Sequence, residues 1–172
     1  MPAQPLSAAP YMPMRQQIGL DEIQNPAVQH AYELWNRQRG VRAYPARGDI
    51  TPRQMPDLLR NVALVRVLEG GEEFQIRVMG DALVEAHGAN FQGLTMHEID
   101  LLLPEYGAAI GELYRFVCKT RSPRAFRGWY RRDADKHAFF HESVLLPLGA
   151  EGKPIDHILV VAVYARRGEE LH

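Results

Sequence analysis

The feature that most constrains the fold is a nearly unbroken apolar run close to the C-terminal end of the sequence. Residues 156–166 read DHILVVAVYAR, with almost no alternation of polar and apolar side chains. A strand of this composition is typical of a sheet that is covered on both faces, because side chains on either face must leave water. A chain of 172 residues can bury such a core without a disulfide or a metal.

Four segments before this run also have the composition of strands. Residues 61–68 and 73–79 are rich in Val, Leu and Ile and flank a Glu-Gly-Gly-Glu turn, so they predict a β-hairpin. Residues 125–132 and 138–148 precede the apolar run and form a predicted three-strand meander with it. A hairpin and a meander can share one antiparallel sheet, so we expect an α+β fold with five strands.

Helices are predicted before the hairpin and between the hairpin and the meander. The pair Asn25–Pro26 has the residue types of a helix start. Two short helices are expected, at 82–87 and after the capping box at 95–98, and the longest helix is expected to open at Pro104. These later helices would cover one face of the sheet, which leaves the first helix for the other face.

The first helix carries one apolar stripe with helical spacing. Its members are Val28, Ala31, Tyr32 and Trp35. Residues at i, i+3, i+4 and i+7 share one side of a helix, so the stripe must pack against the chain's own domain or against a second copy. These four residues are our candidate interface for a homodimer or a protein partner.

The flanks of this helix are less regular. Residues 1–20 hold four prolines among Ala, Gln and Met, and we interpret them as a flexible or loosely docked arm. Residues 21–60 comprise the N-terminal helix and a Pro-rich connector, in which one or two short helical turns are expected. Residues 61–167 then form the main domain.

Charge and hydropathy argue against several classes of partner. The net charge is near −1, so the overall basic surface that is typical of nucleic-acid binding is missing. No apolar run approaches the ~18 residues of a membrane-spanning helix, and we expect no membrane partner. The first residues lack the pattern of a secretory signal, and the lone Cys118 fits a reducing cytoplasm, which is the expected location.

Several short motifs, taken in order, carry a family resemblance. They are Leu34–Trp35 with Arg39–Gly40, the stretch PARGDITP at 45–52, residues 55–59, residues 74–80 with 93–95, and LLPL at 145–148 with Gly152. Over about residues 27–165, the chain resembles a bacterial PAS-like family that is usually found as small stand-alone proteins. The resemblance implies a PAS fold over 61–167, with a five-stranded antiparallel sheet around a small pocket. It also implies a non-catalytic sensory or regulatory module that binds a small ligand, a protein partner or both.

The pocket implied by this resemblance has six candidate ligand-binding residues, which are bulky or polar and stand on strands and helices that should converge. They are Arg77, His87, Tyr114, Tyr130, His141 and Glu142. An inward Arg77 would need an anionic partner, either Glu142 or a ligand carboxylate; the alternative is an Arg77 that faces outward.

The resemblance also bears on haem and flavin. Haem-binding PAS proteins tend to carry the axial His on the long helix, and residues 104–120 contain none, although His87 and His97 stand on the preceding helices. Light-sensing PAS relatives carry a reactive Cys before that helix, where residues 88–92 have none. We therefore expect neither haem nor flavin.

A metal site is not expected either. His137 and His141 are four residues apart, as in a helical zinc motif, but their segment is a predicted strand. At ~3.3 Å per residue they would stand about 13 Å apart, too far to share one ion.

Two other functions stay open. Desolvation raises the pKa of a carboxyl in an apolar pocket, so Glu142 could act as the general base of a small cone-like isomerase or hydratase. No second catalytic group is identifiable. The chain could instead be a ligand-free protein-interaction module.

The arginines around the first strand of the meander have two interpretations. They are Arg121, Arg124, Arg127, Arg131 and Arg132. They form either a patch for an anion or an acidic partner, or a solvated face balanced by Asp133 and Asp135.

Overall fold

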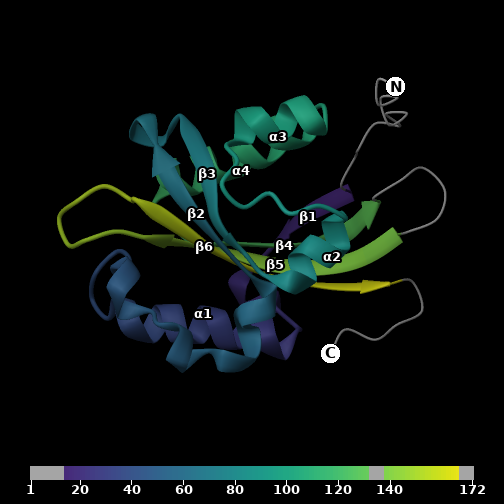
Figure 1. Cartoon of the computed structure of the whole chain (residues 1–172). Coiled ribbons are helices and arrows are strands. Elements are labelled where there is room, and N and C mark those ends of the chain that lie inside the picture. Colours follow the sequence, from purple (N-terminus) through teal and green to yellow (C-terminus); the bar gives the residue numbers. More distant parts are fainter. Residues whose placement is uncertain (1–13, 132–137, 167–172) are drawn as a thin grey trace, which may run out of the picture.

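The fold is built on one antiparallel sheet (Figure 1). A computed structural model of the chain describes residues 14–131 and 138–166. The described residues form six strands in the spatial order β1-β4-β5-β6-β2-β3. The strands are β1 (Met14–Ile18), β2 (Val62–Leu68), β3 (Glu73–Met79), β4 (Arg124–Arg131), β5 (Ala138–Leu148) and β6 (His157–Arg166). The hairpin and the meander therefore share one sheet, as predicted.

The apolar run near the C-terminal end forms β6, which lies inside this sheet between β5 and β2. Leu159, Val161 and Val163 face one side of β6, Val160 and Ala162 face the other, and all five are buried. Both faces of β6 are therefore covered, as its composition predicts.

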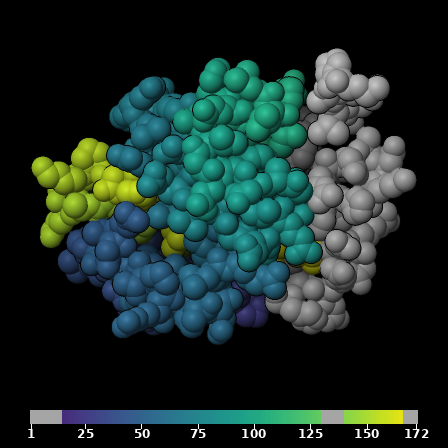
Figure 2. Space-filling model, viewed as in Figure 1, coloured from purple at the N-terminus to yellow at the C-terminus, as the bar shows by residue number. Residues whose placement is uncertain are grey.

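Helices provide this cover on both faces (Figure 1). α1 (Pro26–Arg39) contacts β5 and β6 on one face. The other face is covered by α2 (Asp81–His87), α3 (Met96–Leu102) and α4 (Tyr106–Thr120). Figure 2 shows that the side chains of the two helical layers hide most of the sheet from this side.

The start of α1 follows its sequence signals. The side-chain oxygen of Asn25 accepts hydrogen bonds from the backbone N–H groups of Ala27 (2.9 Å) and Val28 (3.3 Å). Pro26 takes the first helical position, where a backbone N–H would have no helical partner. Between Arg39 and β2 the chain forms three short 3₁₀ helices, where the sequence predicts one or two helical turns. They are Arg47–Asp49, Pro52–Gln54 and Pro56–Asn61.

The apolar stripe of α1 packs on the chain's own sheet. Val28, Ala31 and Trp35 are 0%, 1% and 2% exposed, and half-buried Tyr32 stacks on Trp35. The indole Nε1–H of Trp35 donates to the carbonyl oxygen of Pro147 on β5 (2.8 Å). This corrects the interface expectation, because a sheet that is apolar on both faces takes its second cover from the same chain.

The sequence predicts five strands, and β1 is a sixth. Residues 14–18 lie within the segment that we interpret as a loose arm, and they pair with β4 from Met14↔Trp129 to Ile18↔Ala125. The sequence MRQQI has few of the β-branched and aromatic residues that mark a strand. β1 is held by a ladder with residues distant in the sequence, which no local pattern records. The rest of the predicted arm, residues 1–13, lies outside the described residues.

A close approach of α3 and α4 fixes where α4 begins. A Cβ at Gly107 would collide with the carbonyl oxygen of Met96, so a larger residue could not stand there without displacing α3. Glu105, just before the helix, has a left-handed backbone conformation with φ 73°. The helix therefore begins at Tyr106 rather than at Pro104, and the Tyr106 side chain lies between α4 and the sheet.

Candidate ligand-binding site

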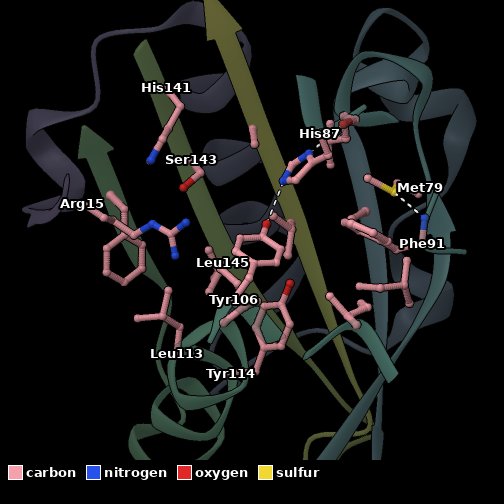
Figure 3. Close-up of a pocket in the computed structure, with 18 of the residues that line it drawn as sticks. Arg15, Met79, His87, Phe91, Tyr106, Leu113, Tyr114, His141, Ser143 and Leu145 are labelled. Atoms are coloured by element: carbon pink, nitrogen blue, oxygen red, sulfur yellow. Dashed lines mark hydrogen bonds between the residues drawn. The ribbon is translucent and has the colours of Figure 1, made fainter. Parts of the chain in front are cut away.

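A cavity of about 80 Å³ lies between the sheet and the helices α2, α3 and α4 (Figure 3). A single water needs roughly 10–15 Å³ by the same measure, so the cavity has room for a small organic molecule. Apolar side chains form most of its wall, among them Met79, Phe91, Ile110 and Leu145. The polar side chains that line it are Arg15, His87, Tyr106, Tyr114, His141, Ser143 and Tyr164.

One row of residues across the sheet sets the geometry of this cavity. Arg15 on β1 pairs with Gly128 on β4, Gly128 with His141 on β5, and His141 with Tyr164 on β6. Residues in such a row share one face of the sheet. Gly128 has no side chain, and neighbouring strands lie about 4.8 Å apart, so the side chains of Arg15 and His141 stand on either side of a gap about two strand spacings wide.

His141 is buried in this cavity without a hydrogen-bond partner. It is 2% exposed, and neither Nδ1 nor Nε2 has a partner among the described residues. Burial, together with the nearby positive charge of Arg15, lowers the pKa of His141 to about 3. The ring is therefore neutral at neutral pH and presents one N–H donor and one acceptor nitrogen.

Arg15 contributes the one permanent charge that the described lining holds. Its side chain points into the cavity from β1 (Figure 3), and its buried Nε has no hydrogen-bond partner. No carboxylate of the described residues forms an ion pair with it. A guanidinium stays charged throughout the physiological pH range, so this charge faces the cavity without a counter-ion from residues 14–131 and 138–166.

His87 and Tyr106 form a hydrogen-bonded pair on the helical side of the cavity. The Nδ1–H of His87 donates to the carbonyl oxygen of Leu83 (2.7 Å), so its Nε2 accepts from the hydroxyl of Tyr106 (2.7 Å). Burial lowers the pKa of His87 to about 4. Burial also raises the pKa of Tyr106 well above 10, and that of Tyr164 to about 12. These groups are neutral at neutral pH.

Three of the six predicted ligand-binding residues meet at this cavity. His87, Tyr114 and His141 all line it. Arg77 is exposed on β3, outside the lining. Tyr130 belongs to β4, but its side chain lies outside the described residues.

Glu142 lies on the opposite face of the sheet, towards α1. Successive side chains of a strand alternate between faces, so His141 and Glu142 cannot both enter the cavity. The Glu142 carboxylate accepts hydrogen bonds from the backbone N–H groups of Gln24 (3.0 Å) and Asn25 (2.7 Å). It also accepts from Nε (3.1 Å) and Nη2 (2.8 Å) of Arg127. Its expected place in the pocket is corrected, and it is not available there as a general base.

Sequence reasoning missed four of the polar lining residues. Ser143 and Tyr164 share the face of His141 by strand alternation and register, so strand parity could have pointed to them once His141 was chosen. Tyr106 stands four residues before Ile110, so the two share one side of the long helix. Arg15 belongs to a strand with no sequence signal.

The other described candidates make contacts away from the cavity, whereas the side chains of Arg131, Arg132, Asp133, Asp135 and His137 lie outside the described residues. Arg127 binds Glu142, Arg124 stacks over Phe116 (4.6 Å from the ring centroid), and Arg121 stacks over the ring of Tyr44 (5.4 Å). Burial raises the pKa of Cys118 to about 11, which favours the unreactive thiol. Across residues 14–131 and 138–166, no group of three His, Cys, Asp or Glu side chains is placed to bind a metal. Within the same residues, no helix has the length and apolar character needed to cross a membrane.

Comparison with known families gives one finding. A family model described as a PAS domain matches residues 23–161, which include α1, β2 to β5 and the first half of β6. A search of curated proteins finds no match. The matched region contains every polar lining residue of the cavity other than Arg15 and Tyr164.

Proposed function

Because the chain belongs to the PAS domain family, we propose that it is a non-catalytic sensory or regulatory domain that binds a small molecule in the cavity under α2, α3 and α4. The family supports the sensory role, and the cavity supports the small molecule. The ligand would replace water around the polar groups that face this space.

The observation that carries the proposal is the unpartnered ring of His141. A buried donor or acceptor without a partner costs about 1–3 kcal/mol, and proteins rarely keep one without a reason. His141 lines the cavity, is 2% exposed, and has no hydrogen-bond partner for either buried ring nitrogen among the described residues. A bound molecule that hydrogen-bonds to the ring would remove this cost.

The chemistry of the lining favours binding over catalysis. A general base works best with a pKa near the operating pH. Burial moves the pKa of His87 and His141 down to about 4 and 3, and that of Tyr164 up to about 12. Glu142, the carboxylate on which an isomerase or hydratase would depend, lies on the other face of the sheet.

We propose that the domain passes its signal on by association with a protein partner. The apolar stripe of α1 is occupied by the chain's own sheet, so a partner must contact another surface. Leu101 and Leu102 at the end of α3 are large, exposed apolar side chains on the layer that covers the cavity. They are the first positions to test by substitution with Ser in a binding assay.

The direct test compares the mass of the full chain in native and denaturing mass spectrometry after gentle purification. We expect a small molecule that is released on denaturation and that is lost in His141→Leu. The matched control is His97→Leu, since His97 is exposed on α3. A cavity that stays empty in the native spectrum, together with no stabilisation of the chain by any compound of a small-molecule library, would overturn the proposal in favour of a ligand-free interaction module.

A further inference from the structure

We propose that the cavity selects small organic acids, with the ligand carboxylate held between Arg15 and His141 above Gly128. This inference rests on the proposed function and adds the chemical class of the ligand. It follows from the charge of the cavity, from the gap in the row across the sheet, and from the apolar character of the remaining wall.

The charge of the described lining is positive and uncompensated. Arg15 brings a permanent cation, and no carboxylate stands among the lining residues that the structure describes. The buried histidines and tyrosines of the lining add no negative charge at neutral pH. A half-buried cation is stabilised by a paired anion. The described residues supply none at this place, so the ligand is the source of the negative charge.

The geometry suits a planar carboxylate. A guanidinium presents its N–H donors as a rigid fork that matches the two oxygens of a carboxylate. His141 offers a further N–H from across the gap above Gly128, because Arg15, Gly128 and His141 stand in one row. The hydroxyl of Ser143, two residues along β5, points into the same space (Figure 3).

The rest of the cavity favours an organic acid over an inorganic anion. Met79, Phe91 and Leu145 belong to a mostly apolar wall, which cannot satisfy the remaining oxygens of a phosphate. An apolar or aromatic group of the ligand would fill this part of the cavity and gain stability from burial. The volume of about 80 Å³ limits the ligand to a small acid.

The cation comes from outside the matched family region. The PAS match begins at residue 23, whereas Arg15 stands on β1, which is the edge strand beside β4. An acid bound to Arg15 therefore links β1 to the domain, so the ligand should hold β1 against β4 more firmly. This gives the acid a structural effect that a neutral ligand of the same shape would not have.

The test measures the binding of three matched acid and amide pairs to the full chain by calorimetry. The pairs are isobutyrate and isobutyramide, benzoate and benzamide, and phenylacetate and phenylacetamide, with inorganic phosphate as a further probe. We expect at least one acid to bind at least tenfold more tightly than its amide and than phosphate. Arg15→Gln should lower the affinity for that acid by about ten- to a hundredfold, because it removes a charged hydrogen-bonding partner. The affinity for the amide should not change.

Two controls separate charge from folding. Arg77→Gln changes an exposed arginine on β3 and should leave the affinity for the acid unchanged. Hydrogen exchange of the amides in β1 should slow in the presence of the acid in the parent chain but not in Arg15→Gln. Unchanged amide binding in Arg15→Gln shows that the cavity is intact.

The possible results are distinct. Equal binding of an acid and its amide, equal binding of phosphate, or an acid affinity that Arg15→Gln does not change would each overturn this inference while leaving a ligand-binding cavity. If none of the probes binds while native mass spectrometry finds a different, uncharged ligand, this inference is overturned and the proposed function stands. If that spectrum is also empty and no library compound stabilises the chain, both are overturned.

Discussion

The two faces of β5 differ in how a buried polar residue is hydrogen-bonded. On the α1 face, the carboxylate of Glu142 is 0% exposed and accepts hydrogen bonds from two backbone N–H groups and from Arg127. On the cavity face, His141 is equally buried, yet neither ring nitrogen has a partner among the described residues. Burial alone therefore does not tell a structural group from a binding group.

The difference lies in hydrogen bonding. Glu142 anchors the start of α1 to the sheet, and every contact that it needs comes from the chain itself. His141 and Arg15 line a cavity that the described residues leave unfilled. The α1 face should therefore respond to substitution mainly through stability, and the cavity face mainly through binding.

The largest effect is expected from Trp35→Ala on the α1 face. This substitution removes a buried aromatic side chain and its hydrogen bond to Pro147, so the free energy of unfolding should fall by about 3–5 kcal/mol in urea denaturation. Trp129→Ala is the matched control, because Trp129 is 41% exposed and should lose far less. The contrary result is a Trp35→Ala chain that keeps its stability but no longer self-associates in light scattering. That result would mean that the apolar stripe of α1 is an interface between two copies of the chain.

Glu142→Gln should follow closely. The amide leaves the Arg127 cation without its counter-ion and turns N–H donors towards the backbone N–H groups of Gln24 or Asn25. We expect the free energy of unfolding to fall by about 3 kcal/mol. This is the lower end of the range for breaking a buried ion pair, because Arg127 is partly exposed. Glu112→Gln on the exposed side of α4 should change stability by no more than about 0.5 kcal/mol. Equal losses in the two variants would contradict the anchoring role.

Acid should weaken the cavity face through its two buried histidines. Their pKa is lowered in the folded chain from 6.5 to about 4 for His87 and about 3 for His141, so below pH 6.5 the unfolded chain takes up protons that the folded chain does not bind. Stability is thus complete above pH 6.5 and is lost as the pH falls towards 4 and 3, by roughly 2 kcal/mol per histidine between pH 7 and pH 5. Urea unfolding at several pH values would measure this loss, and His141→Leu should halve it. A stability that stays constant from pH 7 to pH 5 would be inconsistent with neutral, buried rings.

The smallest effect is expected from His141→Leu at neutral pH, and it has the opposite sign. Leucine is similar in size and needs no hydrogen bond, so the ligand-free chain should gain about 1 kcal/mol in the free energy of unfolding. The same change should abolish ligand binding. A clear loss of stability in the ligand-free chain would mean that the ring has a structural partner after all, and the contrast with Glu142 would disappear.

The elements that the sequence predicts well are those that short-range chemistry specifies. The cap at Asn25, the capping box at Thr95 and the apolar run of β6 all act within a few residues, and the structure has each of them. β1 depends instead on its ladder with β4, so its residues carry no local signal and the sheet was predicted one strand short.

The site was half predictable for the same reason. Residue type pointed to His87, Tyr114 and His141, which meet at the cavity only because strand register and helix packing bring them together. Choosing both His141 and Glu142 overlooked strand alternation, which allows only one of them on each face. Arg15 could not be found, because its position depends on a strand that only the three-dimensional structure reveals.

The short connection between β1 and α1 gives the Glu142 anchor a second meaning. β1 ends at Ile18 on the sheet edge beside the cavity, and by Gln24 and Asn25 the backbone is already bound to Glu142 on the far side of the sheet. Because this connection is so short, we expect any shift of β1 to displace the first turn of α1. Ligand binding in the cavity would then shift α1 on the opposite face of the sheet. The shift would pass through the connection around the edge of the sheet rather than through its interior.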